Sequence, residues 1–407
     1  MGDINSILIT LSGLVILSYL FNILSKYVKI PSVILLLATG VSLKFISDKF
    51  GLQPPSGIPF FLSFFGEVGL IMIVLEGSLD LEVTRSKLPM IGRSLLSAIL
   101  IMAGTCGLIY LLLHGYLGIP VKQAFVYSIP MAVISSAIAI PSVKGLSDHK
   151  KEFIVYESTF SDIIGIMVFG FGILDNAMSS ESFVTFFLNF LYIILISLVG
   201  SAILVFMLNR LTSTIKSFLI FAILILIYAV AKTFHLPALL LVLTFGVALN
   251  NNRRYIKGKL AKTLHLEKMS SVTNEVKLFT AECSFLVRTF FFVLFGYSMN
   301  IGSLIEPQVI ITGSAIIICV LFARYIFLRF ISKVNVIPEV FIAPRGLVTV
   351  VLFYSIPAQY VSSLFNVGIL YYVIIVSSVI MMLGLMFTKT EYSELDPLVA
   401  GGEVPLK

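Results

Sequence analysis

Long apolar runs alternate with short polar connections along nearly the whole chain. Each run has about 20 residues, the length that a helix needs to cross a hydrocarbon core of about 30 Å. The runs lie near residues 4–24, 30–47, 60–80, 91–113, 120–142, 153–175, 184–208, 217–234, 236–250, 278–299, 308–331, 338–358 and 366–388. Because a chain in lipid must satisfy its own backbone hydrogen bonds, this pattern predicts an all-α polytopic membrane protein with about thirteen transmembrane helices.

The composition and the placement of charge agree with a membrane location. Hydrophobic residues make up 58% of the 407 residues and charged residues only 12%, against about 25% charged residues in a soluble domain. The net charge of +7 is spread over connections, so we expect a lipid bilayer and no nucleic acid as partner. Lys and Arg concentrate on one side, which predicts an outer N-terminus and a cytoplasmic C-terminus in a cell membrane, interpreted as a bacterial inner membrane. The longest polar stretch, 253–277, is expected to be a basic cytoplasmic loop.

Two segments of the first half recur in the second half. Pro31 and Gly40 have the same spacing as Pro237 and Gly246, and Val74 to Gly77 resembles Val293 to Gly296. The offsets of 206 and 219 residues (246 − 40 and 296 − 77) correspond to seven spans. Seven is odd, so the copies, about 4–175 and about 217–388, cross the membrane in opposite directions. Inverted-topology repeats are typical of secondary transporters, whose sites lie between the two halves.

Two spans at corresponding places in the copies contain helix breakers. Ser135 and Ser136 lie between Pro130 and Pro141 in one span, and Pro344-Arg345-Gly346 interrupts the other. Proline removes a backbone donor, and unwound backbone is tolerated in a membrane only where protein or water satisfies it. The pair favours two discontinuous crossed helices over ordinary proline kinks, with carbonyl and hydroxyl oxygens available to a cation.

Asp162 is an acidic residue inside an apolar span. It follows Lys151 by about ten residues, roughly 15 Å, which places it near the middle of the bilayer. A carboxylate there costs roughly 3 kcal/mol or more, so its default interpretation is functional. Burial favours a neutral site, so a proton and a cation (Na⁺ or K⁺) should compete for this carboxylate, and that competition predicts exchange. The candidate ligands beside Asp162 are Ser161, Ser158, Ser135 and Ser136.

The other charges inside spans are given structural roles. Glu157 lies about 140° around the helix from Asp162 and needs its own partner. Arg324 lies at a matching depth, so we predict a structural Glu157–Arg324 ion pair; the alternative is that Arg324 extends to the inner surface. Arg345 is expected to compensate the C-terminal dipoles of the broken helices. Arg288 is expected at the membrane interface, and a solvated rim is expected from the acids Glu76, Asp80 and Glu82.

Other kinds of chemistry have no support in the sequence. No phosphate-binding glycine loop, nucleophile triad or zinc spacing is present, and the four histidines fall in connections or span ends. We therefore expect no enzyme activity and no cofactor. A channel or a sensor that keeps the fold without exchange is the remaining alternative.

These residues resemble the monovalent cation/proton antiporters, in particular the sodium/proton exchanger (NhaP-like) branch. The run Glu157-Ser158-Thr159-Phe160-Ser161-Asp162 matches the family's Glu-Ser-x-x-Asn-Asp except at Ser161, and Ala323-Arg324 and Pro344-Arg345-Gly346 match two further family motifs. The resemblance implies a homodimer with a role in pH homeostasis and a transmembrane domain over 1–390. Its core spans would be about 91–175 and 308–388, with the span at 278–299 adjoining and the remaining spans dimerising. Residues 391–407 would form a short cytoplasmic tail.

Two departures from the family pattern affect the expected transport. The family's Asn before the essential Asp is Ser161 here, and a single acid at that pair favours electroneutral one-for-one exchange. The family's Thr/Ser-Asp-Pro in the first broken span is replaced by Ser135-Ser136-Ala137. The cation is therefore predicted to be Na⁺, with K⁺ as the alternative and Li⁺ as a further substrate.

Overall fold

Every regular element in the described part of the chain is helical. The structure, a computed structural model, describes residues 4–28, 31–51, 57–143, 145–173, 195, 199–200, 216–233, 238–255, 266–332 and 336–387. The helices are α1 (Ile4–Val28), α2 (Ser32–Lys49), α3 (Ile58–Asp80), α4 (Leu88–Gly115), α5 (Val121–Ala132), α6 (Ser136–Ser142), α7 (Asp148–Gly172), α9 (Lys216–Thr233), α10 (Ala238–Tyr255), α12 (Leu266–Ser298), α13 (Ile301–Leu304), α14 (Pro307–Ser332), α15 (Leu347–Tyr354) and α16 (Gly368–Phe387), with 3₁₀ turns η1 (Glu339–Phe341) and η2 (Ala358–Tyr360).

The predicted all-α membrane fold is confirmed. Within the described residues, seven segments are long and apolar enough to cross a membrane, with α5 and α6 counted as one span. The predicted span at 184–208 falls mostly outside the described ranges, as does the predicted tail at 391–407. One boundary was wrong: α10 continues to Tyr255 and α12 begins at Leu266, so much of the expected loop 253–277 is helix. Polar residues with good helix propensity extend these helices past the apolar runs.

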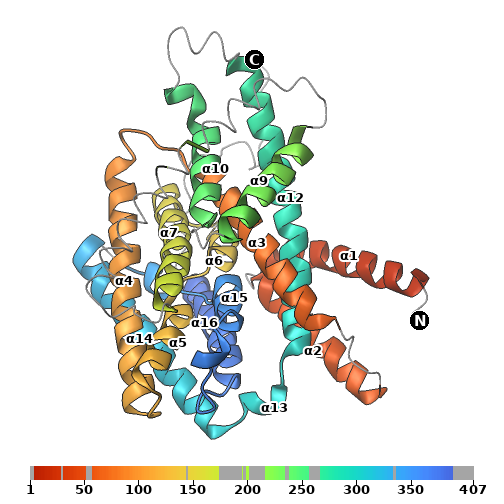
Figure 1. The fold of residues 1–407 in the computed structure, drawn as a ribbon, viewed down its shortest axis with the longest axis vertical. Helices are drawn as coiled ribbons and strands as arrows, with labels where there is room; N and C mark the ends of the chain where they lie inside the picture. Colours follow the sequence, from red (N-terminus) through yellow and green to blue (C-terminus); the bar gives the residue numbers. More distant parts are fainter. Residues whose placement is uncertain are drawn as a thin grey trace, which may run out of the picture.

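The helices pack in two groups. One group contains α4, α5, α6, α7, α14, α15 and α16, and the other contains α1, α2, α3, α9, α10 and α12. In Figure 1 the first group lies on the left, and α1, α2, α3 and α12 lie on the right. The groups meet where α3 packs against α6, α7 and α15. The short half-helices therefore lie at the boundary between the two groups.

The repeated glycines mark two close helix crossings. A Cβ atom at Gly40 would collide with the carbonyl oxygen of Val293 and lie 2.9 Å from the Cα of Gly296, so α2 and α12 are in backbone contact. In the other copy, a Cβ atom at Gly246 would collide with Ser78, beside Gly77, where α10 crosses α3. Small residues allow this approach between membrane helices. Helix α2 of the first copy therefore packs against α12 of the second copy, and α10 of the second copy packs against α3 of the first. These two contacts are equivalent under the symmetry of an inverted repeat.

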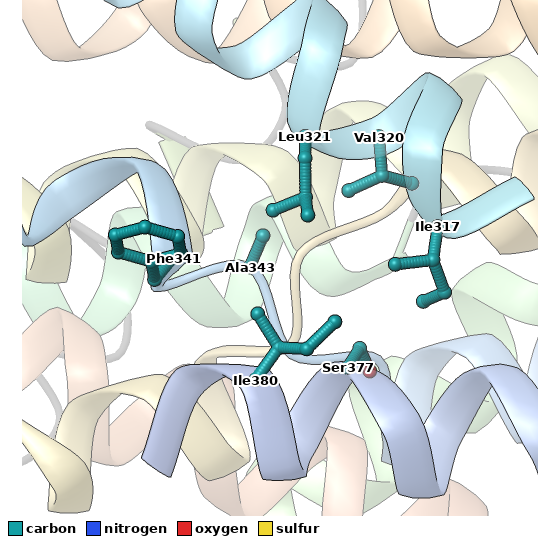
Figure 2. Close-up of a pocket in the computed structure, with 7 residues that line it drawn as sticks. All are labelled: Ile317, Val320, Leu321, Phe341, Ala343, Ser377 and Ile380. Atoms are coloured by element: carbon teal, nitrogen blue, oxygen red, sulfur yellow. The ribbon is translucent and has the colours of Figure 1, made fainter. Parts of the chain in front are cut away.

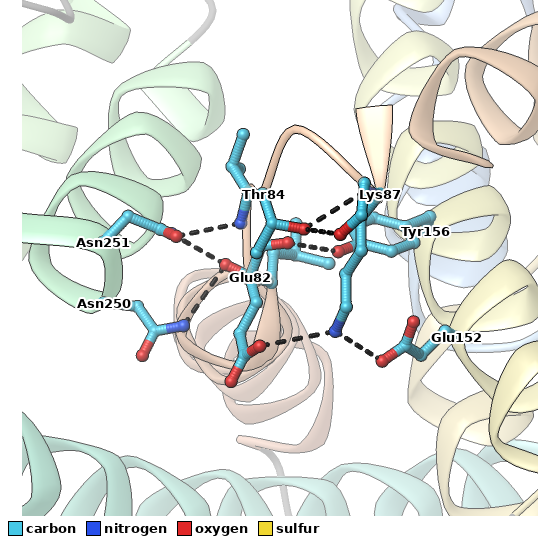
Figure 3. Close-up of polar contacts among 10 residues, drawn as sticks. Glu82, Thr84, Lys87, Glu152, Tyr156, Asn250 and Asn251 are labelled. Atoms are coloured by element: carbon cyan, nitrogen blue, oxygen red, sulfur yellow. Dashed lines mark hydrogen bonds and ion pairs between the residues drawn. The ribbon is translucent and has the colours of Figure 1, made fainter. Parts of the chain in front are cut away.

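The connector between α3 and α4 is held from both groups (Figure 3). On one side, the Asn251 side chain of α10 accepts the N–H of Val83 at 2.8 Å. On the other side, Lys87 forms an ion pair with Glu152 of α7 at 2.6 Å. The polypeptide therefore passes from one helix group to the other through a segment that is bonded to both.

Candidate functional site

The two interrupted spans cross each other at their breaks. Helix α5 ends at Ala132 and α6 begins at Ser136, while α15 begins at Leu347 after an extended stretch. The N–H of Ser135 donates to the carbonyl of Pro344 at 2.9 Å, which joins the two breaks directly. Gly346 permits this approach, because a Cβ atom there would lie 2.7 Å from the Oγ of Ser135. The crossed arrangement predicted from the prolines is present.

Side chains of α7 bind the backbone N–H groups of the first break. The Ser161 hydroxyl accepts the N–H of Ile134 at 2.9 Å, and Asp162 Oδ2 accepts the N–H of Ser136 at 3.2 Å. Unpaired backbone donors are costly away from water. Ser161 and Asp162 therefore both stabilise the unwound segment.

Arg345, which belongs to the second copy of the repeat, binds carbonyl groups at the break of the first copy. Its Nε donates to the carbonyl of Met131 at 2.8 Å and its Nη2 to that of Ala132 at 3.2 Å. These are the last residues of α5, where helix carbonyls lack intrahelical partners. The guanidinium is fully buried, and its positive charge lies at the negative end of the α5 dipole.

Asp162 has one bound and one unbound carboxylate oxygen. Its side chain is buried, with 1% of the residue exposed. Oδ2 accepts both the N–H and the hydroxyl of Ser136, whereas Oδ1 is buried without a hydrogen-bond partner. Among the described residues, no Lys, Arg or His forms an ion pair with it. The Asp162 carboxylate is thus buried with one oxygen bound to the break and with no ion-pair partner among the described residues.

The four candidate serines differ in what their hydroxyls do. Ser135 Oγ is buried and unpartnered, next to the crossing. Ser136 binds Asp162, and Ser161 binds the backbone of the break. Ser158 donates to the carbonyl of Ile154 at 2.7 Å, within its own helix. The structure therefore brings Ser135, Ser136 and Ser161 to the Asp162 site, whereas the Ser158 hydroxyl is engaged one turn away.

Glu157 and Arg324 form a bidentate ion pair. The Arg324 Nη1 and Nη2 atoms lie 3.1 and 2.7 Å from the two Glu157 oxygens, and both residues are almost completely buried. The pair has further partners, because Ser97 donates to Glu157 at 2.8 Å and Arg324 Nε donates to the Glu339 carbonyl at 2.7 Å. The pair joins α4, α7 and α14, and the charge of Glu157 is balanced without involving Asp162.

One charged contact was missed from the sequence. Arg288 and Glu76 were expected at the interface and in a solvated rim, but Arg288 Nη2 lies 3.3 Å from Glu76 Oε2, and its side chain is only 15% exposed. Arg288 Nη1 also donates to the carbonyl of Ala137 in α6 at 3.4 Å. The signal available in the sequence was the position of Arg288 near the middle of the predicted span 278–299.

A family model described as "Sodium/hydrogen exchanger, transmembrane" matches residues 13–389. The chain belongs to the sodium/hydrogen exchanger family. Its fold is that of the sodium proton antiporter MjNhaP1 from Methanocaldococcus jannaschii. One MjNhaP1 structure matches with a TM-score of 0.68 and 17% identity, covering 93% of this chain and 94% of that chain. A second, from electron microscopy, matches with a TM-score of 0.67 and 17% identity, covering 94% and 95%. No curated protein matches the chain by sequence.

Membership of the sodium/hydrogen exchanger family makes the chain a transporter with Na⁺ and H⁺ as the family's substrates, and not an enzyme. A small recess lies beside the break that precedes α15, between α14 and α16 (Figure 2). Apolar side chains line this recess, apart from Ser377, whose hydroxyl accepts the N–H of Arg345 at 3.0 Å. The side chains that line this recess offer one oxygen, that of Ser377, whereas the crossing brings the oxygens of Asp162, Ser135 and Ser136 onto adjoining segments. The crossing is therefore the candidate ion site.

Proposed function

We propose that the chain exchanges Na⁺ for H⁺ across the membrane, one for one, with Asp162 as the shared binding site. The observation that supports this proposal is the state of the Asp162 carboxylate, which is buried without an ion-pair partner among the described residues and without a hydrogen-bond partner at Oδ1. An unpaired buried anion is strongly unfavourable. A proton or a monovalent cation bound at Asp162 removes that cost, and each excludes the other.

The proposed stoichiometry follows from counting the acids at the site. Among the described carboxylates, Asp162 is bound to the backbone of the first break, whereas Glu157 is paired with Arg324 at 2.7 Å and Glu76 with Arg288 at 3.3 Å. One negative charge takes up one H⁺ or one Na⁺, so the loaded site has the same net charge in both cases. We therefore propose electroneutral exchange. Ser135 and Ser136 supply neighbouring oxygens, and oxygen ligands suit hard cations.

Alternating access is proposed as relative movement of the two helix groups. The site lies at their boundary, the location typical of transporters built from inverted repeats. The group containing α4, α5, α6, α7, α14, α15 and α16 would carry the ion, with α12 adjoining it. Helices α1, α2, α3, α9 and α10 would form the homodimer contact. The empty site holds an uncompensated anion and would be costly to move through a low-dielectric barrier, which couples the two fluxes. An outer N-terminus and a cytoplasmic C-terminus complete this proposal.

The proposal is tested with purified protein in proteoliposomes that contain a fluorescent pH dye. Na⁺ should collapse an imposed pH gradient for the wild type and for Asp148→Asn, and should fail to do so for Asp162→Asn. Asp148 is the matched control because it lies exposed in the first turn of the same helix. Wild-type exchange by Asp162→Asn would refute the site assignment.

Two further arms test the coupling and the cation. An imposed membrane potential should leave the rate of electroneutral exchange unchanged; potential-driven flux without proton coupling would instead identify a channel on the same fold. Parallel measurements with Na⁺, Li⁺ and K⁺ test the cation. A response to K⁺ alone would replace the Na⁺ assignment with K⁺/H⁺ exchange.

A further inference from the structure

Thr349, in the first turn of α15, has a buried hydroxyl without a hydrogen-bond partner. Two other buried helical threonines bind their own helix: Thr280 donates to the Val276 carbonyl at 2.6 Å, and Thr289 donates to that of Phe285 at 2.8 Å. Such back-bonding requires a helical carbonyl four residues earlier. For Thr349 that residue precedes Leu347, the first residue of α15, and lies in the extended break. The helix break therefore deprives this hydroxyl of its usual acceptor. Thr105 in α4 and Thr312 in α14 are also buried without a described partner, so the position of Thr349 at the crossing is what distinguishes it.

The face of α15 that carries Thr349 packs toward the first broken span. Thr349 and Phe353 are four residues apart and share one face of α15, and Gly346 directly precedes the helix. At the start of the helix, a Cβ atom on Gly346 would lie 2.7 Å from Ser135 Oγ. At the other end, the Phe353 ring lies 5.7 Å from that of Tyr127 in α5.

The opposite side of α15 is occupied by a different helix. Leu347 and Val351 pack against Gly69 and Gly66 of α3. Thr349, two residues from each, is rotated about 200° from both and faces away from α3. Thr349 is thus directed to the region of the crossing where Ser135 and Asp162 lie.

Three buried oxygens without a described hydrogen-bond partner lie on the segments that form the crossing. They are Oδ1 of Asp162 in α7, Oγ of Ser135 in the first break and Oγ1 of Thr349 at the start of α15. All three residues are almost completely buried, where polar atoms ordinarily have partners. Building on the proposed function, we infer that Thr349 is a ligand of the transported cation, so that the bound ion bridges the two copies of the repeat.

The hydroxyl of Thr349 assists the cation step and not the proton step. A proton on Asp162 forms a covalent O–H bond and needs no further ligand, whereas a small cation needs several oxygens around it. Loss of the Thr349 hydroxyl should weaken Na⁺ binding and leave protonation of Asp162 unchanged.

The test compares Thr349→Val, which keeps the shape and removes the oxygen, with Thr349→Ser, which keeps the oxygen. Thr280→Val is the control, because it removes a buried hydroxyl that binds its own helix in the other helix group. The Na⁺ concentration for half-maximal exchange is measured from pH 6 to 9 in proteoliposomes, and Na⁺-induced proton release is measured on purified protein in detergent. Thr349→Val should raise the half-maximal Na⁺ concentration about tenfold, the scale of effect expected for a contact that supports a bound metal. The maximal rate and the proton competition constant should not change.

Several outcomes overturn the inference. Wild-type Na⁺ affinity in Thr349→Val does so, and so does an equal loss in Thr349→Ser or in Thr280→Val. A reduced maximal rate with unchanged Na⁺ affinity indicates a structural role instead, and Thr349→Ala repeats the measurement if the valine variant does not fold. Asp162→Asn, measured in parallel, separates this inference from the proposed function. Normal exchange by Asp162→Asn would contradict both proposals. If Asp162→Asn is inactive while Thr349→Val binds Na⁺ as the wild type does, only the ligand role of Thr349 is contradicted.

Discussion

Removing one partner of the Glu157–Arg324 pair should destabilise the protein severely. In Arg324→Met, the Glu157 carboxylate stays buried with Ser97 as its remaining hydrogen-bond donor, and the Glu339 carbonyl loses the donor now at 2.7 Å. Leaving one buried charge without its partner costs about 3–5 kcal/mol, and the lost hydrogen bond adds about 1 kcal/mol. Because native proteins are stable by only about 5–15 kcal/mol, this variant should keep a small part of the wild-type stability.

The assay is denaturant-induced unfolding of the purified protein in detergent micelles, followed by circular dichroism. Glu157→Leu and Arg324→Met should each unfold at lower denaturant concentration than the wild type. The double variant should be more stable than the sum of the two losses predicts, because it buries no unpaired charge. Additive losses in the double variant, or wild-type midpoints in the single variants, would refute the reasoning.

A matched control is Lys232→Met, which breaks the ion pair with Glu67. That pair is about half exposed, and exposed pairs contribute only about 0–1 kcal/mol. A loss at Lys232 as large as that at Arg324 would show that burial does not set the effect.

Three further predictions concern packing, pH and the first break. Gly40→Ala should prevent the close approach of α2 and α12 and reduce the yield of folded protein on size-exclusion chromatography, whereas Gly107→Ala, which meets nothing within 4 Å, should behave as the wild type. The hydrogen bond to Glu152 raises the pKa of Lys87 above its ordinary value of 10.5. The folded pKa is the higher one, so the stabilisation is fully present below pH 10.5 and is lost as the pH rises through the raised pKa; the melting temperatures of wild type and Lys87→Met should therefore converge in that range. Ser161→Ala should leave a buried N–H without an acceptor, cost about 1–3 kcal/mol of stability and weaken exchange without abolishing it in the pH-dye assay.

The features that could be predicted from the sequence were those carried by unusual residues in apolar runs. Prolines marked both broken spans. The repeated Pro and Gly spacings marked two pairs of equivalent helices, α2 with α10 and α3 with α12. Glu157 and Arg324 could be paired because a buried charge needs a partner at the same depth. The fold class required little more than the length and number of the runs.

The remaining features depend on side-chain direction at the crossing, which no spacing specifies. Ser135 and Ser161 are equivalent in sequence terms, yet Ser161 accepts the Ile134 N–H while Ser135 has a free hydroxyl. The contact of Arg288 with Glu76 could not be predicted either, because the two residues are 212 positions apart and spacing does not show which side chains meet between helices. Thr349 had no signal of its own, because the sequence does not show which buried hydroxyls lack a partner or lie beside the crossing.

The contact between Arg345 and the carbonyl of Met131 has a consequence for biosynthesis. The two residues are separated by 214 positions, and chains grow at about 5–20 residues per second, so about 10–40 s pass before the guanidinium is made. During that interval the carbonyls at the end of α5 lack their final partner, although that half-helix has already left the ribosome. The first copy therefore enters the membrane before its break has all of its hydrogen bonds. Those bonds are completed only when Arg345 of the second copy reaches Met131 and Ala132.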